Sequence, residues 1–271
     1  MKLTRSQILL ISVVIIVVVT LFIKGYKSST TTKETTATVS LSKEFDFQEY
    51  LLTEKARLGA DQQEKINSLE KVQDKQNFQQ LIVLWDSLKN PLIAAHYSLE
   101  YAGVEPTEKN WFAAGIKYYG VAASATDSLI IGEAAKNAEK AFEKVLALNP
   151  NNLEAKTALA SCYIQIDQDV MKGVGMLKEV IEKDSNNVQA IYTLGMLSIQ
   201  SGQLDKAQQR FEKLVSLQPF NPEFYFYLGE VYAKLGESKK AIATYEKCKT
   251  LLSDKEAKKE IETLINKLKN I

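Results

Sequence analysis

Few side chains in this sequence are of the types that carry catalysis or metal binding. His96 is the only histidine in 271 residues, which excludes a multi-histidine metal site and a histidine relay. Cys162 and Cys248 lie far apart in the chain, without the short spacing of a metal-binding pair. We expect His96 to be structural and both cysteines to be buried as small hydrophobic residues, with a disulfide or redox site as the alternative for the thiols.

The sequence gives equally little support for a phosphate-binding loop or for catalytic carboxylates. The segment KGVGM (172–176) is glycine-rich, but it falls within a helical pattern and not after a strand, where a phosphate-binding loop would begin. Acidic residues occur mostly on solvated helix faces, as in EAAKNAEKAFEK (133–144). The sequence therefore predicts no enzyme, no catalytic residue, no metal site and no cofactor.

The composition is that of a globular helical protein without an electrostatic specialisation. Apolar residues make up 45% and charged residues 25% of the chain, and 12 glycines and 5 prolines leave room for long helices. A net charge of +1 creates no field that would draw the whole protein to nucleic acid, so we expect no nucleic-acid partner. The lysine-rich C-terminus is most simply a solvated cap, and contact with an acidic partner or membrane surface is its alternative.

The elements that would position a binding site are set by a repeat of 34 residues. One stretch carries Leu194, Gly195, Ser198, Ala207 and Phe211, and the same spacing recurs in Leu228, Gly229, Tyr232, Ala241 and Tyr245. A period of this size indicates pairs of helices stacked into an array. The small residues at Gly195 and Ala207 predict that the two helices of one repeat cross there, with large residues filling the space to the next helix.

This pattern resembles the tetratricopeptide repeat (TPR), whose signature is W-x2-L-G-x2-Y followed by A-x3-F, an alanine and a proline. Repeats beginning at Val188 and Pro222 fit best, and a third begins at Leu153. In the repeat before it, Trp111 and Ala138 are separated by 11 residues more than in a regular repeat, which could lengthen its first helix. A weaker fifth repeat, LIVLWDSLKNPLIAAHYSLEYA (81–102), would have Pro91 open its second helix and would set these residues on the marked positions: Ile82, Ala95, Leu99 and Ala102.

The predicted fold is thus an all-α TPR solenoid of about five helix pairs over residues 76–255. Residues 43–75 have the apolar spacing of two amphipathic capping helices, and residues 256–271 that of a solvating helix at the end of the array. The whole layout resembles membrane-anchored TPR proteins of Bacteroidetes-type bacteria. That resemblance implies a fold and a place in the cell more than it implies an activity.

The N-terminus predicts a membrane anchor. Ile8–Ile23 is uncharged and lies between basic residues on both sides, within an N-terminal tail and transmembrane segment at 1–27. A cleaved signal peptide is the competing interpretation, but no small-x-small site follows the segment. A flexible Ser/Thr-rich linker follows at 28–42. The flanking charges nearly balance, and the linker favours a single-pass inner-membrane protein with its bulk in the periplasm.

The resemblance also places a candidate groove, because the first helices of TPR pairs line the concave face. Aromatic residues are more frequent there than the core requires, which predicts contact with protein or peptide segments that carry apolar anchors. Packing against the capping helices or a second copy in a homo-oligomer is the alternative. The groove candidates are Phe112, Ile116, Tyr119, Tyr192, Met196, Ile199, Phe226, Tyr227 and Glu230.

The same helices lack the charged residues with which some TPR proteins hold acidic chaperone C-termini. The corresponding sixth position of each repeat holds Leu81, Ala113, Ala158, Thr193 and Tyr227. We therefore expect a non-enzymatic, membrane-anchored scaffold or adaptor in cell-envelope assembly. The alternative is an assembly factor for cytochrome c maturation that holds apocytochrome segments.

Overall fold

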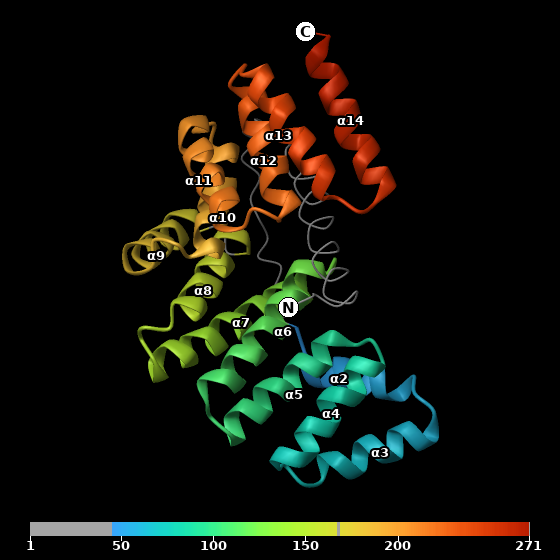
Figure 1. Ribbon diagram of the computed structural model, residues 1–271. Helices are drawn as coiled ribbons and strands as arrows, with labels where there is room; N and C mark the ends of the chain where they lie inside the picture. Colours follow the sequence, from blue (N-terminus) through green and yellow to red (C-terminus); the bar gives the residue numbers. More distant parts are fainter. Residues whose placement is uncertain (1–44, 167–168, 271) are drawn as a thin grey trace, which may run out of the picture. The chain divides into compact units, whose positions relative to one another are not determined.

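The computed structural model describes residues 45–166 and 169–270 (Figure 1). Over these residues the regular elements are thirteen α-helices, labelled α2 to α14, and there is no strand. The prediction of an all-α TPR solenoid is confirmed at this level. Ile8–Ile23 and the Ser/Thr-rich linker lie outside the described residues. None of the helices that the structure does describe combines the length and apolarity needed to cross a membrane.

The described residues divide into two compact parts, one up to residue 169 and one from residue 170, which we call the N-terminal part and the C-terminal part. From α3 to α8 each helix packs against the next one along the chain, whereas α2 contacts α5 through the ring of Phe47 on His96. Asp74, Asn90 and Thr107 each accept a backbone N–H bond at the start of a helix, which satisfies a donor that has no partner within the helix. The helices are α2 (Phe47–Ala56), α3 (Ala60–Glu70), α4 (Lys75–Ser87), α5 (Pro91–Val104), α6 (Glu108–Ser124), α7 (Ser128–Leu148) and α8 (Leu153–Gln165).

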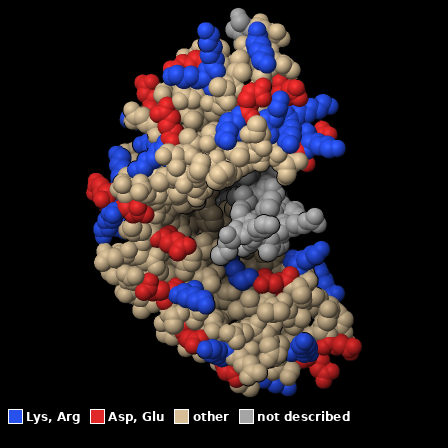
Figure 2. All heavy atoms as spheres, in the orientation of Figure 1, with Lys and Arg blue, Asp and Glu red and all other residues tan. Residues whose placement is uncertain are grey.

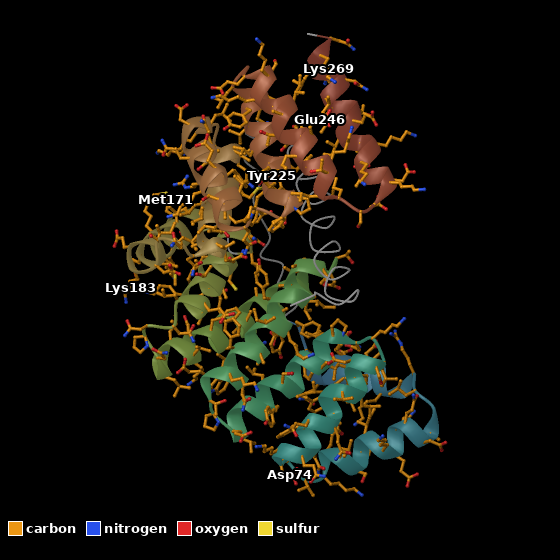
Figure 3. The ribbon with its side chains drawn as sticks, viewed as in Figure 1. Asp74, Met171, Lys183, Tyr225, Glu246 and Lys269 are labelled. Carbon is orange, nitrogen blue, oxygen red and sulfur yellow. The ribbon has the colours of Figure 1, made fainter. Side chains whose placement is uncertain are left out.

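The C-terminal part contains the two most regular repeats. Gly202 and Gly236 end α10 and α12 with φ of +70° and +78°, a conformation that glycine adopts without steric cost and that turns the chain into the second helix of each pair. Ile261 and Ile265 of α14 are buried against α13 and close the core. Lysine and acidic side chains gather on the visible face of these helices (Figure 2), and Lys269 lies at the C-terminal end of α14 (Figure 3). The helices are α9 (Val170–Lys183), α10 (Val188–Gln200), α11 (Leu204–Leu217), α12 (Pro222–Lys234), α13 (Ser238–Leu251) and α14 (Lys255–Lys269).

The repeat glycines make room for an aromatic ring of the second helix. A Cβ added at Gly195 would lie 3.0 Å from Cε2 of Phe211, and one added at Gly229 would lie 2.6 Å from Cε1 of Tyr245. In both cases the ring, sixteen residues further along the chain, supplies all three nearest atoms. The space at each repeat glycine is therefore occupied by a ring of the second helix; at Gly195 that ring lies one helical turn beyond Ala207.

The irregular repeat at Trp111 takes up its extra residues in both helices. α6 has 17 residues and α7 has 21, whereas α10 has 13 and α11 has 14. The predicted lengthening of the first helix is confirmed in part: α6 is four residues longer than α10, and α7 takes up the other seven. Thr107 starts α6 and Asp127 starts α7 by capping free N–H groups, and the cap at Asp127 ends any continuation of the first helix through this region.

In the fifth repeat, the register of the second helix differs by one residue from the predicted register. α4 and α5 have the same lengths as α10 and α11, and the same three-residue turn separates them. Pro91 is the first residue of α5, as predicted. This register sets Ala94, Ser98 and Tyr101 on the positions of Ala207, Phe211 and Leu214, in place of Ala95, Leu99 and Ala102. Ile82 keeps the position of Gly195.

Candidate partner-binding surface

Six of the nine groove candidates lie together on α10 and α12. We call them the aromatic surface: Tyr192, Met196, Ile199, Phe226, Tyr227 and Glu230. Each of them is half-buried, and the five apolar or aromatic members pack against the core of the C-terminal part. A half-buried ring in contact with a core leaves part of its area for a ligand while its orientation is already fixed.

Ring contacts fix the orientation of this surface. The Tyr192 ring centroid lies 5.9 Å from that of Tyr227 on the neighbouring first helix. Tyr227 lies 5.5 Å from Phe211, and Phe226 lies 6.2 Å from Tyr245. The exposed rings therefore rest on the same two rings that occupy the space left by the repeat glycines. The glycines, the buried rings and the aromatic surface form one continuous stack.

Two carboxylates lie among these rings. The Tyr192 hydroxyl donates a hydrogen bond of 2.7 Å to Oε1 of Glu223, which joins α10 to α12. Burial raises the pKa of Glu223, and the bond from Tyr192 offsets part of that rise. Burial also raises the pKa of Glu230, against the attraction of Lys234. A partner that pairs a basic group with these carboxylates would relieve the cost of their burial.

The three remaining candidates, Phe112, Ile116 and Tyr119, lie on α6 in the N-terminal part. Phe112 lies 5.7 Å from Phe142, a ring that occupies the space beside a repeat glycine, as Phe211 and Tyr245 do. Ile116 is 45% exposed. The Tyr119 hydroxyl donates a 2.5 Å hydrogen bond to Oε1 of Gln165, and burial raises its pKa. Phe112 thus repeats the construction of the aromatic surface, in which a half-buried ring lies against the ring beside a repeat glycine.

Two sixth-position residues do not face a groove. Leu81 is fully buried in the core of α2 to α5. Thr193 is also buried, and its hydroxyl donates to the backbone C=O of Gln189 within α10. Burial removes both side chains from contact with a ligand.

The side chains whose types could carry catalysis or metal binding are largely buried. His96 stacks on Phe47 with ring centroids 4.0 Å apart, and burial lowers its pKa to about 4. Cys162 and Cys248 are buried and form no disulfide, as expected for small hydrophobic residues. Burial raises the pKa of Cys248 to about 11. Across the part of the chain that the structure describes, no group of three metal-ligating side chains comes together.

Family comparisons agree with the repeat pattern. The family model described as "Cytochrome c-type biogenesis protein H TPR domain" matches residues 129–225, and one described as "Tetratricopeptide repeat" matches residues 211–243. Together these matches run from α7 into α13 and include both helices of the aromatic surface.

Similar proteins are known from curated sequences and from solved structures. The mitochondrial import receptor subunit TOM70 of Rattus norvegicus and that of Mus musculus are each 29% identical over 80 residues, which is 30% of this chain and 13% of those proteins. The chain thus matches about an eighth of the length of these relatives. The structure titled "MamA 41-end from Desulfovibrio magneticus RS-1" has a TM-score of 0.51 and 22% identity, covering 65% of this chain and 94% of that one. At this identity the likeness concerns the fold.

Proposed function

We propose that this chain, a tetratricopeptide-repeat protein, is a non-enzymatic scaffold that binds segments of partner proteins through the aromatic surface of α10 and α12. The observation that carries the proposal is the stack in which Tyr192, Phe226 and Tyr227 rest on buried rings while part of each stays exposed. Rigid aromatic side chains of this kind contribute most of the binding energy at many protein interfaces.

The chemistry of the surface defines the partner more closely. Apolar side chains of the partner would contact the rings together with Met196 and Ile199. Glu223 and Glu230 favour a basic residue beside those anchors, because each carboxylate carries a burial cost that a cation would offset. The preferred ligand is therefore a peptide segment with alternating apolar and basic residues, in helical or extended form.

We place this scaffold at the inner membrane with its bulk in the periplasm. The support is in the sequence: an uncharged Ile8–Ile23 segment with basic flanks, followed by a Ser/Thr-rich linker. An anchor of this kind would confine the scaffold to the envelope and raise its effective concentration for membrane-associated partners. A role in cell-envelope assembly follows from that location.

A second candidate function is assistance in cytochrome c maturation, in which the chain would hold apocytochrome segments. The observation in its favour is the family match to the TPR domain of a cytochrome c-type biogenesis protein over residues 129–225. The two candidates share a binding mode and differ in the partner.

Crosslinking in intact cells followed by mass spectrometry separates the two candidates. A photo-reactive amino acid placed at Met196 would label whatever contacts the aromatic surface. Recovery of envelope proteins supports the scaffold, and recovery of apocytochrome supports the maturation factor. If Met196 yields no crosslinked product while a probe at exposed Lys206, on α11, does, binding occurs elsewhere and both forms of the proposal fail.

A further inference from the structure

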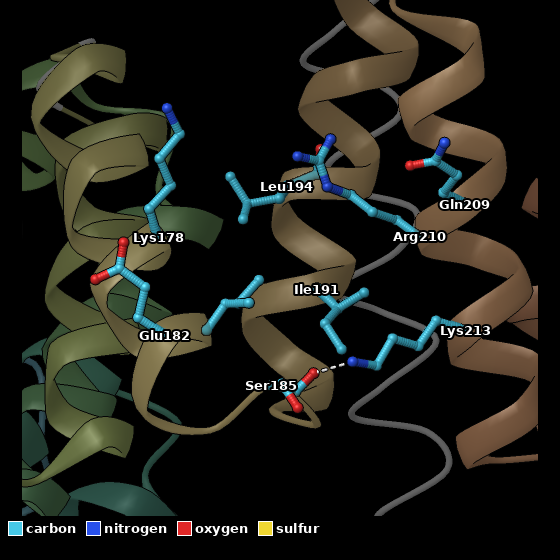
Figure 4. Close-up of a pocket in the computed structure, with 9 residues that line it drawn as sticks. Lys178, Glu182, Ser185, Ile191, Leu194, Gln209, Arg210 and Lys213 are labelled. Atoms are coloured by element: carbon cyan, nitrogen blue, oxygen red, sulfur yellow. Dashed lines mark hydrogen bonds between the residues drawn. The ribbon is translucent and has the colours of Figure 1, made fainter.

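A second surface of the C-terminal part lies between the two second helices α9 and α11. A cavity of about 380 Å³ opens there above α10 (Figure 4). Its floor is apolar and consists of Ile181, Ile191 and Leu194. Ile191 and Leu194 are almost completely buried, so the floor of the cavity belongs to the hydrophobic core.

Cations surround this apolar floor. Lys178 projects from α9, and Arg210 and Lys213 project from α11 across the opening (Figure 4). Glu182 is the one carboxylate among the lining residues that the structure gives for this cavity. The rim therefore carries a positive excess in a protein whose overall charge is close to neutral.

Arg210 is held in place by hydrogen bonds to α10, the helix that its side chain crosses. Its Nη1 donates to the C=O of Leu194 at 3.3 Å and to Oγ of Ser198. The other guanidinium N–H groups have no acceptor among the residues that the structure describes, and they are left for a ligand. Lys213 donates to the C=O of Ser185, which holds its ammonium group at the mouth of the cavity.

The repeat itself provides an internal comparison 34 residues further along the chain. The larger, half-buried side chain of Tyr225 replaces Ile191 there, and its hydroxyl donates to the C=O of Pro219 at 3.3 Å. Glu212 replaces Lys178 and Thr244 replaces Arg210, so of the three cations only Lys213 has a basic counterpart, Lys247. The cavity and its charge are thus features of this one junction and are not imposed by the TPR pattern.

We propose that this cavity binds a second peptide segment, one that carries an apolar side chain next to an acidic residue. The apolar side chain would cover the floor of Ile181, Ile191 and Leu194, and the carboxylate would accept hydrogen bonds from Arg210 and a neighbouring lysine. An isolated phosphate or a nucleic-acid backbone suits the site less well, since neither would cover the apolar floor of Ile181, Ile191 and Leu194.

The proposal goes beyond the scaffold function, because the two surfaces select opposite charges. The aromatic surface carries Glu223 and Glu230, whereas the cavity carries three cations. Alternate faces of α10 serve the two sites, with Tyr192 on one and Ile191 on the other. A chain with both sites could hold a basic and an acidic segment at the same time and so bring two partners together.

The test is fluorescence anisotropy with the full-length protein and a labelled short peptide in which one leucine is flanked by glutamates. We expect saturable binding, and a loss of about tenfold or more in affinity for the double variant Lys178→Glu and Lys213→Glu. Lys247→Glu is the matched control for the substitution of Lys213, since it makes the same single charge change at the equivalent position of the next repeat. Phe226→Ala, on the aromatic surface, should leave this binding unchanged.

Several results would overturn the assignment. One is equal affinity of the wild type and the double variant for the peptide, and another is an equal loss in Lys247→Glu. Undiminished binding of a peptide with alanine in place of leucine would show that the apolar floor takes no part. Binding of a single-stranded oligonucleotide in place of the peptide would reassign the site to nucleic acid. If the double variant does not fold, Lys178→Ala gives the same test, because Lys178 is exposed.

Discussion

Tyr245 lies so close to Gly229 that a Cβ at position 229 would stand 2.6 Å from Cε1 of the tyrosine ring. The relationship recurs between Gly115 and Phe142, where the distance would be 2.5 Å. Side chains essentially never approach so closely in folded proteins. The glycine and the ring are therefore one structural device, and the ring in turn supports the exposed aromatics of the first helices.

Substitution of the repeat glycines tests whether the ring of the second helix needs the space that glycine leaves. Gly229→Ala should lower the free energy of unfolding by about 1–3 kcal/mol, because the Tyr245 ring is buried and has to shift to admit a methyl group. Gly195→Leu should cost at least as much, since it forces a larger side chain against Phe211. Urea denaturation of each variant measures the change.

Gly175→Ala provides the control for these variants. Gly175 is exposed on α9 and has no atom within 4 Å of an added Cβ, so alanine should stabilise the helix by about 0.5–1 kcal/mol. Unchanged stability of Gly229→Ala alongside a stabilised Gly175→Ala would show that the ring is not confined by the glycine.

The regular repeats could be predicted from the sequence because their signature is local. Gly195, Ala207 and Phe211 recur at the same spacing in the next repeat, and helix pairs follow from that spacing alone. The ring contacts could not be predicted, since they depend on how far Phe211 and Tyr245 reach across the helix pair. The cation-lined cavity was missed for a similar reason: Lys178 and Arg210 lie on different helices, and each alone has the pattern of a solvated face.

The irregular repeats show the limit of counting residues. Eleven extra residues between Trp111 and Ala138 specify a longer hairpin, but the turn within it is set by the cap at Asp127. In the fifth repeat, Ile82 and Ala94 have the 12-residue separation of Gly195 and Ala207, whereas Ala95 lies one residue too far along the chain. The helix bounds agree with Ala94.

His96 should make the protein sensitive to acid. Burial lowers its pKa to about 4 in the folded state, whereas the unfolded chain titrates near 6.5. Between these values the unfolded state binds more protons, so the free energy of unfolding falls as pH decreases from 6.5 to 4, by up to ~3 kcal/mol from this group. His96→Phe keeps a ring against Phe47 and should lose this component. Thermal melting from pH 7 to pH 4 compares the slopes; parallel profiles for the two proteins would contradict the assignment.

Glu230 should cost stability at neutral pH in return for binding. Burial raises its pKa, so the folded state binds a proton more readily than the unfolded state, and stability from this group rises as pH falls toward the ordinary glutamate range. Glu230→Gln is accordingly expected to melt higher than the wild type at pH 7, with the difference shrinking at lower pH, and to recover less of a basic partner. A variant that melts lower at pH 7 would refute the burial argument.

The topology is testable in spheroplasts. With an anchor at Ile8–Ile23 and the body in the periplasm, externally added protease should digest the repeat array without lysis. A cytoplasmic protein of the same cells is the control for integrity. Digestion of the array only after lysis would reverse the proposed orientation.

The central claim is that the aromatic surface binds a partner, and the double variant Tyr192→Ala and Phe226→Ala tests it most directly. Each truncation should remove about 2 kcal/mol or more of binding free energy, because both rings are half-exposed yet held in fixed orientation by their neighbours. The measurement pairs partner recovery after crosslinking in cells with thermal melting of the purified variant. We expect recovery to be lost and the melting temperature to fall less than in Gly195→Leu. Undiminished recovery together with a collapsed melting curve would show that these rings serve only the core, and would contradict the account.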